Sequence, residues 1–468
     1  MRIVTFYLLT LLITQKQIMR RLFFLSILLA STFVFSQKKW TLRECVDYAV
    51  KNNLQVINNQ YNNDIQSKNL AMAKNDYLPT VSGSVNNTAS FGQSQYVNTI
   101  VRNDNFSNNA NIGANIQLYN AGRIRKTAEK SQYDLTASLL DTEKTKNDVS
   151  LQVAQLYLQI LLNKEVKKIT DESVNNAEKV LNRAKITTEI GTTAKTIEAE
   201  ATASLAREKQ RQKSAEIDIE RSLFNLAMLL QLKEFKEFDV QEVPLPSMLA
   251  APLNSTDNII NTAYENQPQV KAAETRILSA QKQIDIAKTQ FYPTVSANAG
   301  IGTIYFNNLS TDITSTLLTG EVIKEKSFFK QYKDNFGQNL GLSLNIPIFN
   351  KGNTKLQVEQ AKISENIAKN TLEQQKLSVR QDVQKAYFDA NANYENFMAA
   401  VEAEKSTKLA LDFAEKSYEA GRSTIYDLNN ARNNYVNAQS TVSQAKYNYI
   451  FSMKLLNFYA GIPLTDNL

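Results

Sequence analysis

The chain offers few residues that could carry out covalent or metal chemistry. It has no histidine and one cysteine, Cys45, among 468 residues, which removes histidine-based metal sites, histidine general bases and disulfides together. Cys45 lies on a periodic apolar stretch, which predicts that it packs rather than reacts. Because no nucleophile stands with a candidate base, we expect the protein not to be an enzyme and to need no metal and no cofactor.

Two glycine-containing segments fall short of phosphate-binding motifs. The run from Gly191 to Thr196 lacks the leading glycine of a phosphate loop, and Gly300-Ile301-Gly302 has Tyr305 where a dinucleotide motif needs its third glycine. The net charge of +7 is spread along the chain, which is typical of solvated helix faces and does not indicate nucleic-acid binding. The remaining candidates are polar residues beside the glycines at 191 and 421, and their role depends on the elements that carry them.

A tandem repeat organises those elements. Pro79 and Pro293 open two similar segments 214 residues apart, whereas Gly122 and Gly352 correspond at an offset of 230 residues. The second copy therefore has 16 extra residues (230 − 214) between its strands, around 308–334. The predicted organisation is a first repeat over 37–231, a proline-containing linker or equatorial segment over 232–255, a second repeat over 256–463 and a tail over 464–468.

Four segments alternate between apolar and small polar residues, which predicts strands at about 79–92, 106–119, 293–306 and 336–349. A soluble antiparallel sheet also alternates in this way. Each run, however, has the roughly 10 residues that a tilted strand needs to cross a membrane, and aromatic residues flank both ends, as in membrane barrels. Four strands cannot close a barrel, so chains must share one. Two chains would give a barrel of 8 strands, whose interior side chains fill, whereas three chains would give 12 strands around an open lumen.

Long helices connect the strands. Between Gly122 and Gly191 there is no proline, and apolar residues recur at steps of three and four, so we expect a helix of about 70 residues and roughly 105 Å. Two shorter helices, 41–76 and 192–231, would stack end to end beside it. The second copy repeats this pattern over 352–421, 256–290 and 422–461. An isolated antiparallel coiled coil is the simpler alternative, but it does not account for the lipid-patterned strands in each half.

The first 36 residues have the pattern of an export signal. A basic pair ending at Arg21 precedes an apolar run of about 14 residues, too short to span a bilayer, and Val34 and Ser36 provide the small residues of a cleavage site. A second apolar run upstream indicates that the true start is Met19, with a signal anchor as the alternative. We expect export without N-terminal lipidation.

Together these features resemble the TolC-type outer-membrane efflux protein family. The resemblance covers about 40–463 and is carried by the start Thr41-Leu42-x-Glu44, the strand openings at Pro79 and Pro293, the strand exits, and the helix turns at Gly191 and Gly421. It implies a mainly α fold with a membrane β-barrel part. Three chains, with four strands each, would form a 12-stranded barrel in the outer membrane on a long periplasmic α-helical barrel.

The resemblance also implies a function. The homotrimer would be the outer-membrane exit duct of a tripartite efflux pump or type I secretion system, working with a periplasmic adaptor protein and an inner-membrane pump or transporter. A non-conducting coiled-coil scaffold or adhesin anchored in the membrane is the alternative. The adaptor would contact the helix turns, at Gly191, Thr192, Thr193, Ala194, Gly421, Arg422, Ser423 and Thr424.

In the same family the periplasmic end is closed beside the second turn. Tyr418 matches the family's tyrosine there, Asp427 its first aspartate and Asn430 the position of its second. Asp427 from three chains would form a carboxylate ring that favours cations. The alternative role for Asp427 is that of a solvated carboxylate at a helix start.

Two positions depart from that pattern. Ser423 stands where the family has an arginine, with Arg422 one residue earlier, and Ile197 replaces the aspartate that follows the first turn. The resemblance therefore predicts an aperture at this end of the molecule but does not match all the contacts that would hold it closed.

Overall fold

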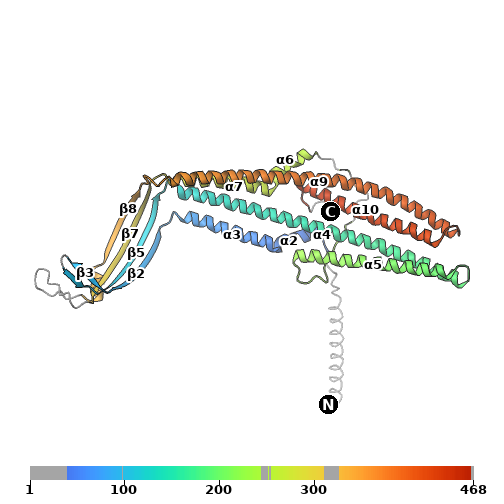
Figure 1. The fold of residues 1–468 in the computed structure, drawn as a ribbon, viewed down its shortest axis with the longest axis horizontal. Coiled ribbons are helices and arrows are strands. Elements are labelled where there is room, and N and C mark those ends of the chain that lie inside the picture. Colours follow the sequence, from blue (N-terminus) through green and yellow to red (C-terminus); the bar gives the residue numbers. More distant parts are fainter. Residues whose placement is uncertain (1–38, 97–98, 244–250, 252–254, 310–325, 465–468) are drawn as a thin grey trace, which may run out of the picture.

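The computed structural model describes residues 39–464, apart from 97–98, 244–250, 252–254 and 310–325. The molecule is elongated, with a β-sheet at one end and antiparallel helices along the rest of its length (Figure 1). The predicted signal sequence, all three linker prolines, part of the extra segment of the second repeat and residues 465–468 lie outside the described residues.

The main sheet combines the two repeats. Its antiparallel order is β2-β5-β7-β8, with β2 spanning Thr80–Ser90, β5 Asn105–Tyr119, β7 Thr294–Asn308 and β8 Gly337–Asn345. The central pair β5 and β7 joins the repeats in a register that sets Ile112 opposite Ile301. Side chains alternate between the faces of a strand, so the aliphatic residues of all four strands share one face, apart from Ile304 of β7.

Three details of this end differ from the sequence-based expectation. β8 ends at Asn345 rather than near 349, because Pro347 has no amide hydrogen to donate to a neighbouring strand. A small hairpin, β3 (Gln93–Tyr96) with β4 (Thr99–Arg102), lies between β2 and β5. A short helix, α8 (Phe328–Asp334), precedes β8. Neither the hairpin nor the helix was predicted.

Two long helices of equal length leave the sheet. α4 (Arg123–Glu189) and α9 (Asn353–Glu419) have 67 residues each, or about 100 Å. Each starts after a glycine in the left-handed region, Gly122 with φ +75° and Gly352 with φ +79°, a conformation that costs glycine least. The helices α5 (Lys195–Leu230) and α10 (Ile425–Tyr459) return from the far end.

Each of the remaining helices is broken once, contrary to the continuous helices predicted over 41–76 and 256–290. In the first repeat α2 (Leu42–Asn52) gives way to α3 (Leu54–Asn75), and in the second α6 (Thr256–Asn266) gives way to α7 (Pro268–Thr289). Asn53 adopts extended backbone between the first pair, and its side-chain oxygen accepts the Gln55 amide hydrogen at 2.9 Å. In the second pair, Pro268 is the first residue of α7, a position that suits proline because the amide there has no partner within the helix.

The helices next to the sheet follow the order of the strands. Near the sheet, α3 packs on α4, α4 on α7, and α7 on α9, and Figure 1 shows the same succession from α3 to α9. Since α3 leads into β2 and β8 leads into α9, one long border of the molecule consists of α3 with β2, and the opposite border of α9 with β8.

The largest core lies about halfway along the helices. It includes Val149, Val153 and Ile160 of α4, all at most 2% exposed, together with residues of α2 and α5. Beside it the strand β1 (Lys39–Trp40) pairs in parallel with β6 (Asp239–Val240). The equivalent core of the second repeat is built from smaller residues such as Ala386 and Ala390. None of the described helices has an apolar stretch of the length and hydropathy needed to cross a membrane.

Candidate functional site

The turns at the end farthest from the sheet share one backbone geometry. At the first, the Gly191 amide donates to the Thr188 carbonyl at 3.0 Å and the Thr192 amide to the Thr187 carbonyl at 3.0 Å. At the second, Gly421 and Arg422 donate in the same way to Tyr418 and Ser417, at 3.0 and 2.9 Å. Both glycines have positive φ, +78° and +71°. This is the Schellman motif, which satisfies the last helical carbonyls, so each glycine has a structural role.

The side chains at the two turns differ. At the first turn Thr193 donates to the Thr187 hydroxyl at 2.9 Å, and Thr192 donates to the Thr187 carbonyl at 2.8 Å. Ala194 precedes α5 without a side-chain cap. At the second turn the Ser423 hydroxyl is buried and has no hydrogen-bond partner among the described residues. The first turn is therefore tied together by threonine hydroxyls, whereas the second depends on the cap that follows it.

That cap contains Asp427. The Asp427 carboxylate accepts hydrogen bonds from the Thr424 amide at 3.0 Å and the Thr424 hydroxyl at 2.7 Å, while the Asp427 amide donates to the same hydroxyl at 3.2 Å. These side-chain and backbone hydrogen bonds lower the pKa of Asp427. The residue is exposed, as is Asn430 one turn further along α10. A capping box at a helix start thus leaves the carboxylate charged and open to solvent.

Tyr418 contacts an arginine, but not one from its own turn. The guanidinium of Arg183, on α4, lies 6.0 Å from the centroid of the Tyr418 ring, within the range of a cation–π contact. The same guanidinium is 3.9 Å from the Glu419 carboxylate. No ion pair joins Arg422 to Asp427 in the part of the chain that the structure describes.

A second ion pair lies close by. Arg432 of α10 donates to the Glu415 carboxylate of α9 at 3.0 Å, and its side chain is only 12% exposed. Both residues line a hollow of 240 Å³ together with Tyr418 and Arg183. The polar contacts around this hollow therefore link α4, α9 and α10.

Apolar packing reinforces this junction. Leu411, Ile425 and Leu428 form a small buried cluster, against which Ile197 of α5 and Tyr418 pack. Ile197 is the residue that replaces the aspartate expected from the resemblance. The four helices that end at the two turns thus meet through side chains of both repeats.

The sequence singles out Tyr418 and Asp427 as candidates, but it gives no signal for Arg183, Glu415 and Arg432, which line the same hollow as Tyr418. Arg183 corresponds to Phe413 at the repeat offset of 230 residues, so the duplication gives no signal for it. Its role depends on how the two helical hairpins are staggered against each other, which neither repeat encodes alone.

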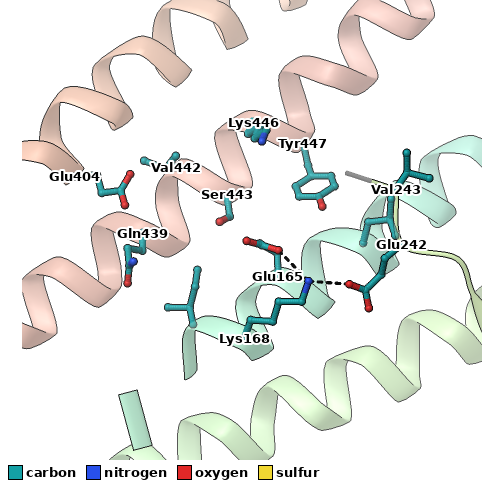
Figure 2. Close-up of a pocket in the computed structure, with 12 residues that line it drawn as sticks. Glu165, Lys168, Glu242, Val243, Glu404, Gln439, Val442, Ser443, Lys446 and Tyr447 are labelled. Atoms are coloured by element: carbon teal, nitrogen blue, oxygen red, sulfur yellow. Dashed lines mark hydrogen bonds and ion pairs between the residues drawn. The ribbon is translucent and has the colours of Figure 1, made fainter. Parts of the chain in front are cut away.

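A larger polar hollow lies near the middle of the helices, beside the start of the linker (Figure 2). Lys168 lies between two carboxylates there, 2.7 Å from Glu242 and 3.6 Å from Glu165. The hydrogen bond between Lys168 and Glu242 raises the pKa of the lysine and lowers that of the glutamate. The hollow measures 520 Å³, and residues of α9 and α10, including Glu404 and Tyr447, line its other side. The charges contributed by α4 and the linker are paired with each other.

Next to this hollow, hydrogen bonds from α4 hold the strand pair formed by β1 and β6. Lys164 Nζ lies 2.5 Å from the Asp239 carboxylate of β6 and donates to the Val240 carbonyl at 3.0 Å. The hydroxyl of Tyr157, which is fully buried, donates to the Gln241 carbonyl at 2.7 Å. These contacts anchor β6 to α4, and β1 is held by its pairing with β6.

A lipid-facing sheet continued by two long helical hairpins defines a class of protein, the outer-membrane channels built partly from helices. The family model described as "Outer membrane efflux protein" matches residues 46–230 and 259–461. The chain belongs to this family, whose members are channel proteins rather than enzymes. The outer-membrane location, with the helical part in the periplasm, and the TolC-like fold that the sequence predicts are both confirmed.

Two relatives illustrate the sequence similarity. The outer membrane protein TolC of Escherichia coli is 30% identical over 194 residues, which is 39% of this chain and 37% of that protein. The alignment thus spans well under half of that relative. The outer membrane efflux protein BepC of Brucella suis is 20% identical over 445 residues, covering 95% of this chain and 90% of that one.

Solved structures show the same fold. The CmeC outer membrane channel of Campylobacter jejuni superposes with a TM-score of 0.71 at 19% identity, covering 91% of this chain and 87% of that chain. The open state of the MtrE channel of Neisseria gonorrhoeae gives a TM-score of 0.69 at 19% identity, covering 90% and 89%.

Proposed function

We propose that three copies of this chain form a closed channel that serves as the outer-membrane exit duct of a tripartite efflux pump or type I secretion system. The observation that carries the proposal is the pair of unpartnered borders, α3 with β2 and α9 with β8. An open strand edge in lipid leaves unsatisfied amides and carbonyls that cost several kcal/mol each. Pairing β8 of one copy with β2 of the next removes both edges and repeats until the barrel closes, with 12 strands for three chains.

The helical borders support the same arrangement. α3 exposes large apolar residues at spacings of seven, four and seven residues, namely Leu54, Tyr61, Ile65 and Met72, which are 55–62% exposed. α9 exposes Leu356, Ile363, Ile367 and Leu377, at spacings of seven, four and ten residues and 53–62% exposure. These are coiled-coil spacings, so α9 of one copy has an apolar stripe for α3 of its neighbour.

The polar face of the sheet then lines a lumen, because the aliphatic face must contact lipid. Asn111, Asn115 and Gln117 of β5 and Asn298 of β7 would contribute uncharged groups to its wall. A duct of this kind needs partners that supply energy, and we propose a periplasmic adaptor and an inner-membrane pump or transporter. The chain itself would carry out no enzymatic step.

The test of the duct is conductance. Full-length protein purified in detergent should behave as a trimer in light scattering and should produce ion-conducting steps in planar bilayers. A trimer that never conducts, even after substitutions at the far end, would instead favour the non-conducting scaffold or adhesin.

For the closed end, we propose that the Arg183 contact with Tyr418 holds the two hairpins of each chain together, while the Arg432 pair with Glu415 joins α9 to α10 within the second hairpin. The lowered pKa and exposure of Asp427 support a ring of three charged carboxylates in the trimer, which favours cations. Asn430, one turn along α10, would add an amide to the same wall.

We also propose that the adaptor contacts the two turns, through residues 191–194 and 421–424. Their position at the end farthest from the membrane and the exposure of Thr192 and Arg422 support this. A photo-crosslinker at Thr192 or Arg422 should capture the adaptor in cells, whereas one at Lys51, exposed at the end of α2, should not.

A further inference from the structure

The short helix α8 lies on the lipid-facing side of the sheet. The Tyr332 hydroxyl donates to the side-chain oxygen of Asn108, and the Phe328 ring lies 4.9 Å from the ring of Tyr305. Asn108 shares a face of β5 with Ala110 and Ile112, and Tyr305 shares a face of β7 with Ile301, because strand side chains alternate. The helix therefore covers the aliphatic face and not the polar one.

α8 covers a stretch of β7 that β8 does not reach. The pairing between the two strands stops at Gly302 and Gly337. Beyond it, the Gln331 side chain accepts from the Phe306 amide at 3.0 Å and donates to the Phe306 carbonyl at 2.9 Å. Thr303 donates to the Tyr332 carbonyl at 2.8 Å, and Asn335 donates to the Ile304 carbonyl at 2.7 Å. These bonds fix the helix at the outer end of the sheet.

The position corresponds to the border between hydrocarbon and headgroups. Val295 and Ile301 lie in the aliphatic band, which in membrane barrels is about 25 Å tall and bounded by aromatic residues. Around α8 the aromatic rings of Phe106 and Tyr305 are 6.2 Å apart, and those of Phe328 and Tyr332 are stacked at 4.4 Å. Asn108, which would be costly in lipid, is only 8% exposed beneath the helix.

The other face of α8 is both aromatic and basic. Phe328, Gln331 and Asn335 recur at helical spacing toward the sheet, which leaves Phe329, Lys330 and Lys333 pointing away. Phe329 is 84% exposed. Of the nearby charges, Asp334 is paired with Lys326 at 2.7 Å, and neither Lys330 nor Lys333 has an ion-pair partner among the described residues. Exposed aromatic and basic side chains on one helix are typical of segments that lie in a membrane interface.

We infer that α8 is an interfacial anchor that binds the anionic headgroups of the outer leaflet. Phe329 inserts at the boundary of the acyl chains, and Lys330 and Lys333 bind the anionic groups beside it. The inference concerns the outer rim and requires only the outer-membrane location of the sheet, so it stands or falls separately from the proposed duct.

Fluorescence quenching in vesicles tests it with the full chain. The chain has one tryptophan, so Trp40→Phe removes the natural signal and Phe329→Trp reports from α8. The vesicles contain phosphatidylcholine and phosphatidylglycerol in fixed proportions, and either lipid carries brominated acyl chains. We expect brominated phosphatidylglycerol to quench at least about twice as strongly per mole as brominated phosphatidylcholine. The reason is that each lysine near the membrane surface attracts the anionic lipid and not the zwitterionic one.

Two double charge reversals, one on α8 and one elsewhere, make the result specific. Lys330→Glu with Lys333→Glu should equalise quenching by the two lipids, whereas Lys51→Glu with Lys185→Glu, on the periplasmic helices, should leave the preference intact. The proposal is wrong if Phe329→Trp is quenched by neither lipid, if both lipids quench it equally, or if the charge reversal leaves the preference unchanged.

Discussion

The guanidinium of Arg183 lies over the ring of Tyr418, 6.0 Å from its centroid, and this contact joins the long helix of the first repeat to that of the second. Tyr418 lies three residues before Gly421, and Arg183 lies eight residues before Gly191. Because the arginine also faces Glu419, the end of α9 cannot move away from α4 without breaking both interactions.

Removing that arginine should loosen the closed end. A cation–π contact at an exposed site is worth about 0.5–1 kcal/mol, or a factor of about two to five in an equilibrium. We expect Arg183→Ala to increase bilayer conductance or open probability by at least that factor. Lys185→Ala, an exposed neighbour on the same helix, is the matched control and should behave as wild type.

Because Arg183 contacts the ring and not the hydroxyl, Tyr418→Phe should conduct as the wild type does, and Tyr418→Leu should resemble Arg183→Ala. The double variant Arg183→Ala with Tyr418→Leu should add little to either single change. Full additivity in conductance would show that the two residues act independently.

The cation preference of the channel should follow the charge of Asp427. Its pKa is lowered by hydrogen bonds from Thr424, so the charge, and any stability that it contributes, is present above the ordinary aspartate value and is lost as pH falls through the lower folded value. Thr424→Ala removes the side-chain bond and should move the loss of selectivity to higher pH. Reversal potentials measured across a salt gradient from pH 3 to 7 would detect this, and identical profiles for the two proteins would contradict it.

The aliphatic face of β8 should not tolerate charge. Leu342 and Leu344 are 74% and 61% exposed in the single chain, and a basic residue on a lipid face costs about 2–4 kcal/mol near the middle of the bilayer. Leu342→Arg or Leu344→Arg should therefore block assembly into the outer membrane, as measured by fractionation. Asn345→Lys, on the opposite face, should assemble, and equal loss from both faces would contradict the assignment.

Cys45 should report unfolding. Burial raises the pKa of its thiol to about 12, and the side chain is fully buried in the central core. In the folded chain the thiol is therefore protonated and a reagent cannot reach it. A maleimide at pH 7.5 should leave the native protein unlabelled and react when guanidinium unfolds the central core. A Lys51→Cys variant should label at its exposed site at once, and rapid native labelling of Cys45 would contradict this packing.

Much of the fold could be predicted because the signals are local and repeated. The period-two runs and the absence of proline between Gly122 and Gly191 are visible without knowledge of the partners they pack against. The break at Asn53 was not predicted, since it depends on one side chain accepting a backbone hydrogen within an otherwise helical pattern. α8 was missed because it belongs to the 16-residue surplus, for which the first repeat has no counterpart.

The site was predicted less completely for a related reason. Tyr418 and Asp427 lie at fixed distances from a recognisable turn, whereas Arg183 and Arg432 act across helices. Ile197 stands where the family resemblance implies an aspartate, and its side chain packs against an apolar cluster. A replacement of that kind changes the chemistry of a junction without changing its position.

The identical lengths of α4 and α9 also limit how such a chain can evolve. One inserted residue would shift the end of a long helix by about 1.5 Å along its axis and rotate it by about 100°. The turn at that end would then no longer lie beside the turn of the other repeat, and the apolar stripe of the helix would no longer face its neighbour. Insertions in one long helix should therefore survive only with a compensating change in the other. The 16-residue difference between the two repeats falls instead between β7 and β8, outside the long helices.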